Sequence, residues 1–211
     1  MEIQTVGKGA LGVLSCLKSA YDNSRKRKID TFMKYVDARY EVMSVDERDQ
    51  LIRYLETDEG QDLLSDYVTN ALNTSSKTVV MAYALLYCDD ADFGFTASEK
   101  RSIVSSLQGI SDELVSLFIE LSKIKPTHEF EMFNRVLVTH HVGENIEHGG
   151  NLYVDVADLI RRGLLLSDPK PNVTDSNDWN IAFAISPLAM QCVRLLEKSE
   201  SLLKSHNNIF K

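Results

Sequence analysis

The sequence has no apolar run long enough to span a membrane, and it has too few cysteines for a disulfide-stabilised fold. A transmembrane helix needs about 18 or more apolar residues in succession, and the longest run, Val79 to Cys88, is roughly half that length. The three cysteines, Cys16, Cys88 and Cys192, lie far apart, which is typical of small core residues in a reducing compartment. We therefore predict a cytoplasmic protein without a membrane span.

Motifs that carry enzyme chemistry are also missing. The sequence has no Gly-x-Ser-x-Gly elbow, no phosphate-binding glycine loop, no dinucleotide fingerprint, no Cys-x-x-Cys pair and no His-Glu-x-x-His zinc motif. Carboxylates are abundant, yet no pattern singles out a catalytic pair among the 31 acidic residues. The sequence therefore predicts a protein with no catalytic residues and no bound cofactor.

Positive charge is outnumbered by negative charge. The 23 lysines and arginines against 31 acidic residues give a formal net charge of -8, which disfavours nonspecific binding to nucleic acids and to anionic membranes. The dense basic run is formed by Arg25, Lys26, Arg27 and Lys28. Such a run is typical of a solvated helix face, and it is also where phosphate would bind if the protein contacts nucleic acid.

Residues 1–125 predict a bundle of about five or six helices. From Ile29 onward, apolar residues recur at helical spacing, at Phe32, Val36, Tyr40 and Met43. They form one seam, which packs either on its own domain or on a second copy of the chain in a homodimer. The segments 44–47 and 96–99 are capping boxes, and residues 79–87 are apolar nearly all round, which predicts the central helix.

Residues 126–211 predict a smaller domain that contains a β-hairpin. The spacing in 154–163 indicates a helix that ends at Gly163, and the apolar run 164–166 is expected to pair with the alternating strand 181–185. Ser186 and Pro187 are suited to begin the last helix. We also expect a helix from Glu129 to Val138.

The segments "VADLIRRGLL", "IAFAIS" and "PLAMQCVRLL" together resemble the second half of a winged helix. The fold class we expect is therefore mainly α, with an N-terminal helical bundle and a small C-terminal winged-helix-like α+β domain. The resemblance implies a DNA-binding regulator in which Arg161 and Arg162 contact the duplex, with Arg25, Lys26, Arg27 and Lys28 as further contacts.

Charge argues against that use of the C-terminal region. From residue 126 to the end, 8 basic residues face 11 acidic ones, and the loop of the hairpin is itself acidic. The loop carries Asp168, Asp175 and Asp178 together with Trp179. These four residues favour a docking surface for a protein partner, one of basic character.

Two clusters of potential metal ligands leave a metal-dependent hydrolase as a second alternative. Asp89, Asp90 and Asp92 lie in one turn, but Phe95 and Arg101 stand where the calcium loop needs glycine and glutamate. The histidines His128, His140, His141 and His148 fall within about twenty residues and are followed by Gly149 and Gly150. Solvated polar turns are the simpler interpretation of both clusters, and we predict no bound metal.

Two family resemblances concern the rest of the chain. The stretch "MAYALLYCDDADFGFTASEKRSIVSSL" is similar to TerB-like helical domains, although Asp92 is followed by Phe93 where those domains have glycine. The whole arrangement resembles small bacterial proteins of the abortive-infection alpha type. The features that carry this resemblance are the glycine-containing start, the basic helix and the helix begun by Ser75-Ser76-Lys77. The second resemblance implies a role in bacterial or phage conflict. We therefore expect a non-catalytic protein-interaction or regulatory module.

Overall fold

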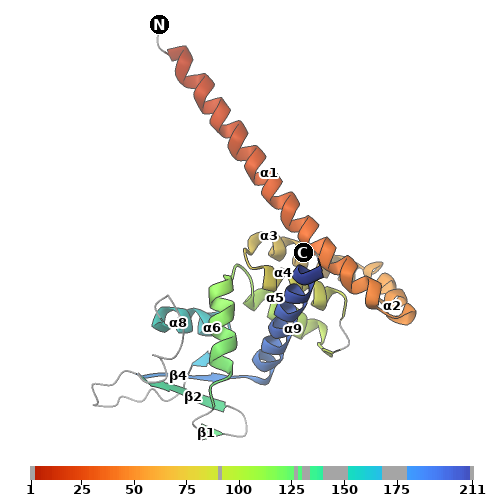
Figure 1. The fold of residues 1–211 in the computed structure, drawn as a ribbon, viewed down its shortest axis with the longest axis vertical. Coiled ribbons are helices and arrows are strands. Elements are labelled where there is room, and N and C mark those ends of the chain that lie inside the picture. Colours follow the sequence, from red (N-terminus) through yellow and green to blue (C-terminus); the bar gives the residue numbers. More distant parts are fainter. Residues whose placement is uncertain are drawn as a thin grey trace.

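The computed structural model describes residues 3–89, 92–125, 128–129, 134–139, 152–167 and 180–209. This part of the chain is mainly helical, with a small antiparallel sheet formed by segments near the C-terminus (Figure 1). The predicted fold class, mainly α with a small α+β part, is confirmed.

Six helices make up the first 122 residues. They are α1 (Ile3–Val42), α2 (Val45–Leu55), α3 (Asp58–Asn73), α4 (Lys77–Tyr87), α5 (Ala97–Ser106) and α6 (Asp112–Ser122). Both predicted capping boxes are present, because the side chains of Ser44 and Thr96 accept from the N3 backbone and the glutamate at N3 binds back to the cap. Ser76 caps α4 and Ser111 caps α6 in the simpler way, each by accepting one backbone N–H.

Helix α1 is 40 residues long, so it extends for about 60 Å. Its C-terminal half lies against the helical body, and its N-terminal half projects away from it (Figure 1). Phe32 and Val36 are only 1% and 7% exposed, and α1 packs on α3 and α4. The apolar seam of α1 is therefore used inside the chain, and a homodimer would need another surface.

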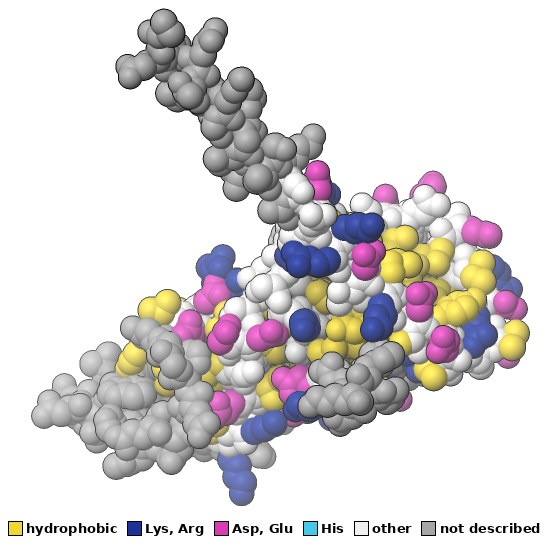
Figure 2. All heavy atoms as spheres, turned by 45° about the horizontal axis from the view of Figure 1, so that its top comes forward, with side chains coloured by type: hydrophobic (Ala, Val, Ile, Leu, Met, Phe, Trp, Pro, Cys, Tyr) yellow, Lys and Arg dark blue, Asp and Glu magenta, His cyan; other side chains and the backbone are white. Residues whose placement is uncertain are grey.

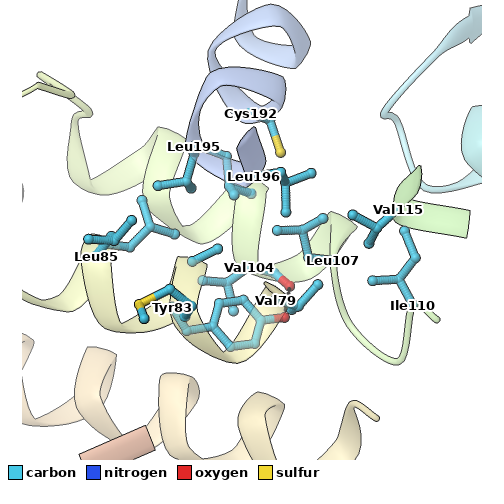
Figure 3. Close-up of a cluster of buried hydrophobic side chains, with 14 of the residues drawn as sticks. Val79, Tyr83, Leu85, Val104, Leu107, Ile110, Val115, Cys192, Leu195 and Leu196 are labelled. Carbon is cyan, nitrogen blue, oxygen red and sulfur yellow. Dashed lines mark hydrogen bonds between the residues drawn. The ribbon is translucent and has the colours of Figure 1, made fainter. Parts of the chain in front are cut away.

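Helix α4 lies at the centre of the bundle, as predicted. Every residue from Thr78 to Leu86 is buried, and the helix is covered by α1, α3 and α9 (Pro187–Ile209). Figure 3 shows side chains of α4, α5, α6 and α9 converging in one apolar cluster. Within it, the hydroxyl of Tyr83 donates to the carbonyl of Val104 at 3.3 Å, so this buried polar group is satisfied.

The C-terminal region forms an antiparallel sheet in the order β1-β2-β4-β3. Its elements are β1 (His128–Glu129), β2 (Asn134–Thr139), α8 (Leu152–Arg161), β3 (Leu166–Ser167) and β4 (Asn180–Ile185). The predicted strand at 181–185 is present, and it pairs with the segment after Gly163, but the pairing is at Leu166 with Ala184 and Ser167 with Phe183 and not along 164–166.

The helix predicted from Glu129 to Val138 is wrong. Residues 134–139 form strand β2, which pairs along its length with β4, for example Val136 with Phe183. A short apolar run with β-branched residues suits either element, and here the backbone of a strand more than forty residues further along the chain supplies its hydrogen bonds.

The two predicted regions share one core. Helix α9 packs on α4 and α6, and one continuous cluster of buried residues runs from Phe32 to Leu196. The boundary between 1–125 and 126–211 stays a prediction. Cys88 and Cys192 are both buried and form no disulfide within the described residues, and no described helix is long and apolar enough to cross a membrane.

The turn between α2 and α3 generates a prediction about stability. A Cβ atom at Gly60 would lie 2.0 Å from the carbonyl oxygen of Tyr54, so the backbone of one helix would have to move. We expect Gly60→Ala to lower the free energy of unfolding by about 1–3 kcal/mol, measured by urea denaturation. Gly94→Ala is the matched control, because no atom lies within 4 Å of its added Cβ. Equal midpoints for the two variants would contradict this account of the turn.

Candidate functional site

The predicted docking loop lies in the sequence between β3 and β4. Asp168, Asp175, Asp178 and Trp179 lie outside the described residues. The structure does describe both ends of the loop, because Ser167 pairs with Phe183 and thereby holds Ser167 and Asn180 on adjacent strands. Helix α8 runs directly into β3 through a turn in which Gly163 has a φ of 75° and Leu164 donates to the carbonyl of Leu159. Helix α8 and strands β3 and β4 therefore belong to one small unit.

The two arginines of this unit both bind Asp158. Arg161 Nη2 lies 2.5 Å from Asp158 Oδ1, and Arg162 Nε lies 2.8 Å from Asp158 Oδ2. Arg162 also donates through Nη1 to the carbonyl of Gln108 at 2.6 Å, and its side chain is only 16% exposed. Arg162 therefore joins α8 to the turn after α5, a structural role that the sequence did not indicate.

The pKa of Asp158 lies below its ordinary value of 3.8. Partial burial acts to raise it, but hydrogen bonds from Arg162 and Arg161, together with their positive charge, lower it by more. The carboxylate is therefore ionised at neutral pH and balances one of the two arginine charges.

The first turn of α8 presents apolar side chains to solvent. Tyr153 is 50% exposed and Val154 is 61% exposed, while Val156 and Leu159 on the opposite face are buried. Large exposed apolar side chains beside charged residues are typical of protein-binding surfaces.

The basic run of α1 lies where this helix meets α3. Lys28 Nζ donates to the carbonyl of Leu72 in the last turn of α3 at 2.7 Å, and Arg27 Nε donates to the carbonyl of Asn23. Arg25 and Lys26 are exposed, and Arg25 lines a shallow depression of about 230 Å³ together with Lys28. Figure 2 shows lysine and arginine side chains interspersed with acidic ones on the face in view. Lys28, one of the four residues of the basic run, thus binds a carbonyl at a helix C-terminus, where a positive charge is favoured.

The acidic turn binds lysines. Asp89 Oδ1 accepts from Lys100 at 2.5 Å, and Asp92 Oδ2 accepts from Lys198 of α9 at 2.5 Å, which lowers the pKa of Asp92. Lys198 also lies over the ring of Phe93, 5.5 Å from its centre. The two aspartates therefore face different lysines and hold the turn on the bundle.

The predicted metal ligands are only partly within the described chain. Asp90, His140, His141 and His148 lie outside it, as does the side chain of His128. In the described ranges, no three His, Cys, Asp or Glu residues are grouped so that they could hold a metal ion.

A cavity between α2, α3, α4 and α5 was not indicated by the sequence. It has a volume of about 320 Å³, and its wall includes Leu51, Tyr54, Tyr67, Asp89 and Lys100. The lining residues come from four helices and from the acidic turn, so no single segment carries a pattern that reveals the cavity.

Comparisons with protein-family models, with curated proteins and with solved structures found no match to this chain.

The Asp158 cluster predicts a pH-dependent contribution to stability. Because the folded pKa of Asp158 is lowered, its contribution is complete above its ordinary pKa of 3.8 and is lost as the pH falls through the lower folded value. We expect Asp158→Asn to lower the free energy of unfolding at pH 7 by about 1 kcal/mol, allowing for solvent screening, and to have little effect near pH 2. Urea denaturation from pH 2 to 7 measures this. Asp62→Asn, at an exposed residue of α3, should leave the profile unchanged, and a pH-independent effect of Asp158→Asn would contradict the prediction.

Proposed function

We propose that this protein is a non-catalytic docking module in which helix α8 and the adjoining β3–β4 hairpin bind a basic segment of a protein partner. The observation that carries the proposal is the pairing of Asp158 with Arg161, at the end of α8, and with Arg162, directly after it, next to apolar side chains that are exposed. The unit that resembles a nucleic-acid reader thus has its positive charge engaged within the chain.

The composition of the hairpin loop supports a partner of basic character. Three aspartates and one lysine lie between Ser167 and Asn180, and Trp179 adds a large aromatic side chain. Aromatic residues contribute much of the energy of protein interfaces, and complementary charge contributes specificity and a faster association rate. Tyr153 and Val154, with exposed fractions of 50% and 61%, would supply the apolar part of the same surface.

The DNA-binding alternative would require these contacts to break. Arg162 is only 16% exposed and would have to leave Asp158 and the carbonyl of Gln108 before it reached phosphate, whereas Arg161 is exposed but has part of its charge offset by Asp158. A metal-dependent hydrolase built on the acidic turn would likewise have to displace Lys100 from Asp89 and Lys198 from Asp92. Neither change is needed for docking of a basic peptide.

The resemblance to abortive-infection proteins of the alpha type supports a role for this docking in bacterial or phage conflict. Identification of the genes on either side of the coding sequence tests that part of the proposal. We expect defence or phage genes there.

Peptide display on the full chain tests the docking surface. We expect selection to enrich lysine- and arginine-rich peptides, because the loop is acidic, and their binding should weaken as salt is added. Val154→Ser should reduce the affinity for the selected peptides by about tenfold, as should the combined change Asp168→Asn, Asp175→Asn and Asp178→Asn.

The matched control is Val45→Ser. Val45 is 70% exposed in the first turn of α2, so it resembles Val154 in residue type, exposure and position within a helix. Peptides that bind Val154→Ser as tightly as the unchanged protein would exclude α8 from the surface. Micromolar binding of duplex DNA that falls steeply with salt would favour the DNA-binding alternative instead.

A further inference from the structure

The N-terminal half of helix α1 extends beyond the helical body (Figure 1). The backbone is helical from Ile3 onward, but α1 is buried only further along, at residues such as Phe32 and Val36. The helices that α1 packs on, α3 and α4, lie beside its C-terminal half. The N-terminal half therefore has no other described element beside it.

The sequence of this half is apolar along one side of the helix. Successive residues of an α-helix are turned by about 100°, so the spacing alone assigns each residue to a face. One arc of about 100° contains six apolar residues, which are Ile3, Val6, Ala10, Val13, Leu14 and Leu17. Lys8 falls opposite the middle of this arc, and Leu11 falls outside it, between Lys18 and Gln4. Residues 3–20 therefore have the pattern of an amphipathic helix.

A polar segment separates this apolar arc from the buried seam of α1. Residues 22–28 include no apolar residue, and apolar residues resume at Ile29. Arg25, Lys26 and Arg27 are exposed in this segment. The apolar arc is therefore not an extension of the seam by which α1 packs on the body, and basic residues lie between the two.

Charge is divided unequally between the two parts of the chain. Residues 1–28 contain six lysines and arginines and two acidic residues, whereas residues 29–211 contain 17 basic and 29 acidic residues. The first part thus has a formal net charge of +4 and the second part has one of -12. An anionic surface would attract the first part and repel the second, although the chain as a whole is acidic.

We propose that residues 3–20 of α1 bind in the interface of a membrane that contains anionic lipids. The apolar arc would enter the boundary between the headgroups and the acyl chains, which is how amphipathic helices with lysines on their polar face bind membranes. Arg25, Lys26 and Arg27 would contact the anionic headgroups. The helix would lie along the membrane without crossing it, because Lys8 and Lys18 interrupt the apolar sequence. The acidic helical body would stay in water.

A second copy of the chain fits this face less well. The apolar arc covers only about two and a half heptads, which is short for a coiled coil. The positions that flank its core hold Gly7, Gly9, Leu14 and Cys16, so a coiled coil would lack the ion pairs that select its partner. The excess of positive charge in residues 1–28 also favours an anionic membrane over a second basic helix.

Vesicle flotation with the full chain tests the proposal. One set of vesicles is phosphatidylcholine alone, and the other contains about 30% phosphatidylserine, which supplies the anionic surface. We expect the chain to bind the phosphatidylserine vesicles at least about tenfold more strongly than the neutral ones. This binding should weaken as salt is added, because salt screens the attraction between the basic residues and the surface.

The variants Leu17→Asn and Leu11→Asn separate the two sides of the helix. The substitution is the same, but Leu17 falls in the middle of the apolar arc and Leu11 falls outside it. Leu17→Asn should weaken vesicle binding by about tenfold, and Leu11→Asn by no more than about twofold. Both should leave the unfolding temperature of the free protein unchanged, because this half of α1 lies beyond the body (Figure 1).

The variants Lys26→Gln and Lys77→Gln test the contribution of charge. Both lysines are exposed, but Lys77 lies in the first turn of α4, in the helical body. Lys26→Gln should weaken binding to the phosphatidylserine vesicles by about fivefold, and Lys77→Gln should leave it unchanged.

Several results would overturn the proposal. The first is the absence of binding to phosphatidylserine vesicles at low salt, and the second is equal binding to both vesicle types. The third is an equal effect of Leu17→Asn and Leu11→Asn on vesicle binding. A lower unfolding temperature of Leu17→Asn would assign the apolar arc to packing within the chain. A dimer in sedimentation equilibrium that Leu17→Asn dissociates would assign it to a second copy.

Discussion

The fold depends on the need to surround helix α4. A helix that is apolar on every side is stable in water only when other elements cover all of it. Helices α1 and α3 cover part of α4, and α9, from the other end of the chain, completes the layer. Leu195 and Leu196 of α9 are fully buried as a result. The last helix is therefore a structural part of the N-terminal bundle, and the small sheet is attached to that bundle at the start of α9.

Several lysines and arginines of this acidic chain bind carbonyls near the C-terminal ends of helices or aspartates in a turn. Lys28 binds a carbonyl in the last turn of α3, and Arg162 binds the carbonyl of Gln108 just after α5. Lys100 and Lys198 bind the aspartates of the acidic turn, which fastens that turn to α5 and α9. Among the basic residues that suggest phosphate binding in the sequence, Lys28, Arg161 and Arg162 thus bind carbonyls or a carboxylate of the chain itself.

The proposed docking surface and the cavity differ in how their polar groups are hydrogen-bonded. On α8, Asp158 is hydrogen-bonded to both arginines and neutralises one of their two charges, and Tyr153 and Val154 of the same helix are exposed. At the cavity between α2, α3, α4 and α5, Lys100 and Asp89 pair with each other, and the Tyr67 hydroxyl is buried without a partner among the described residues.

The sequence alone determined the features that arise from contacts within a few residues. The capping boxes at Ser44 and Thr96 depend on groups three positions apart, and the buried nature of α4 follows from its composition, so both could be predicted. Only the tertiary structure decided that residues 134–139 form a strand, because their hydrogen-bonding partner is β4, far away in the chain. Only the tertiary structure also decided that Arg162 binds the carbonyl of Gln108 and that a cavity lies between α2, α3, α4 and α5. Both features depend on residues that are far apart in the sequence, so no local sequence pattern predicts them.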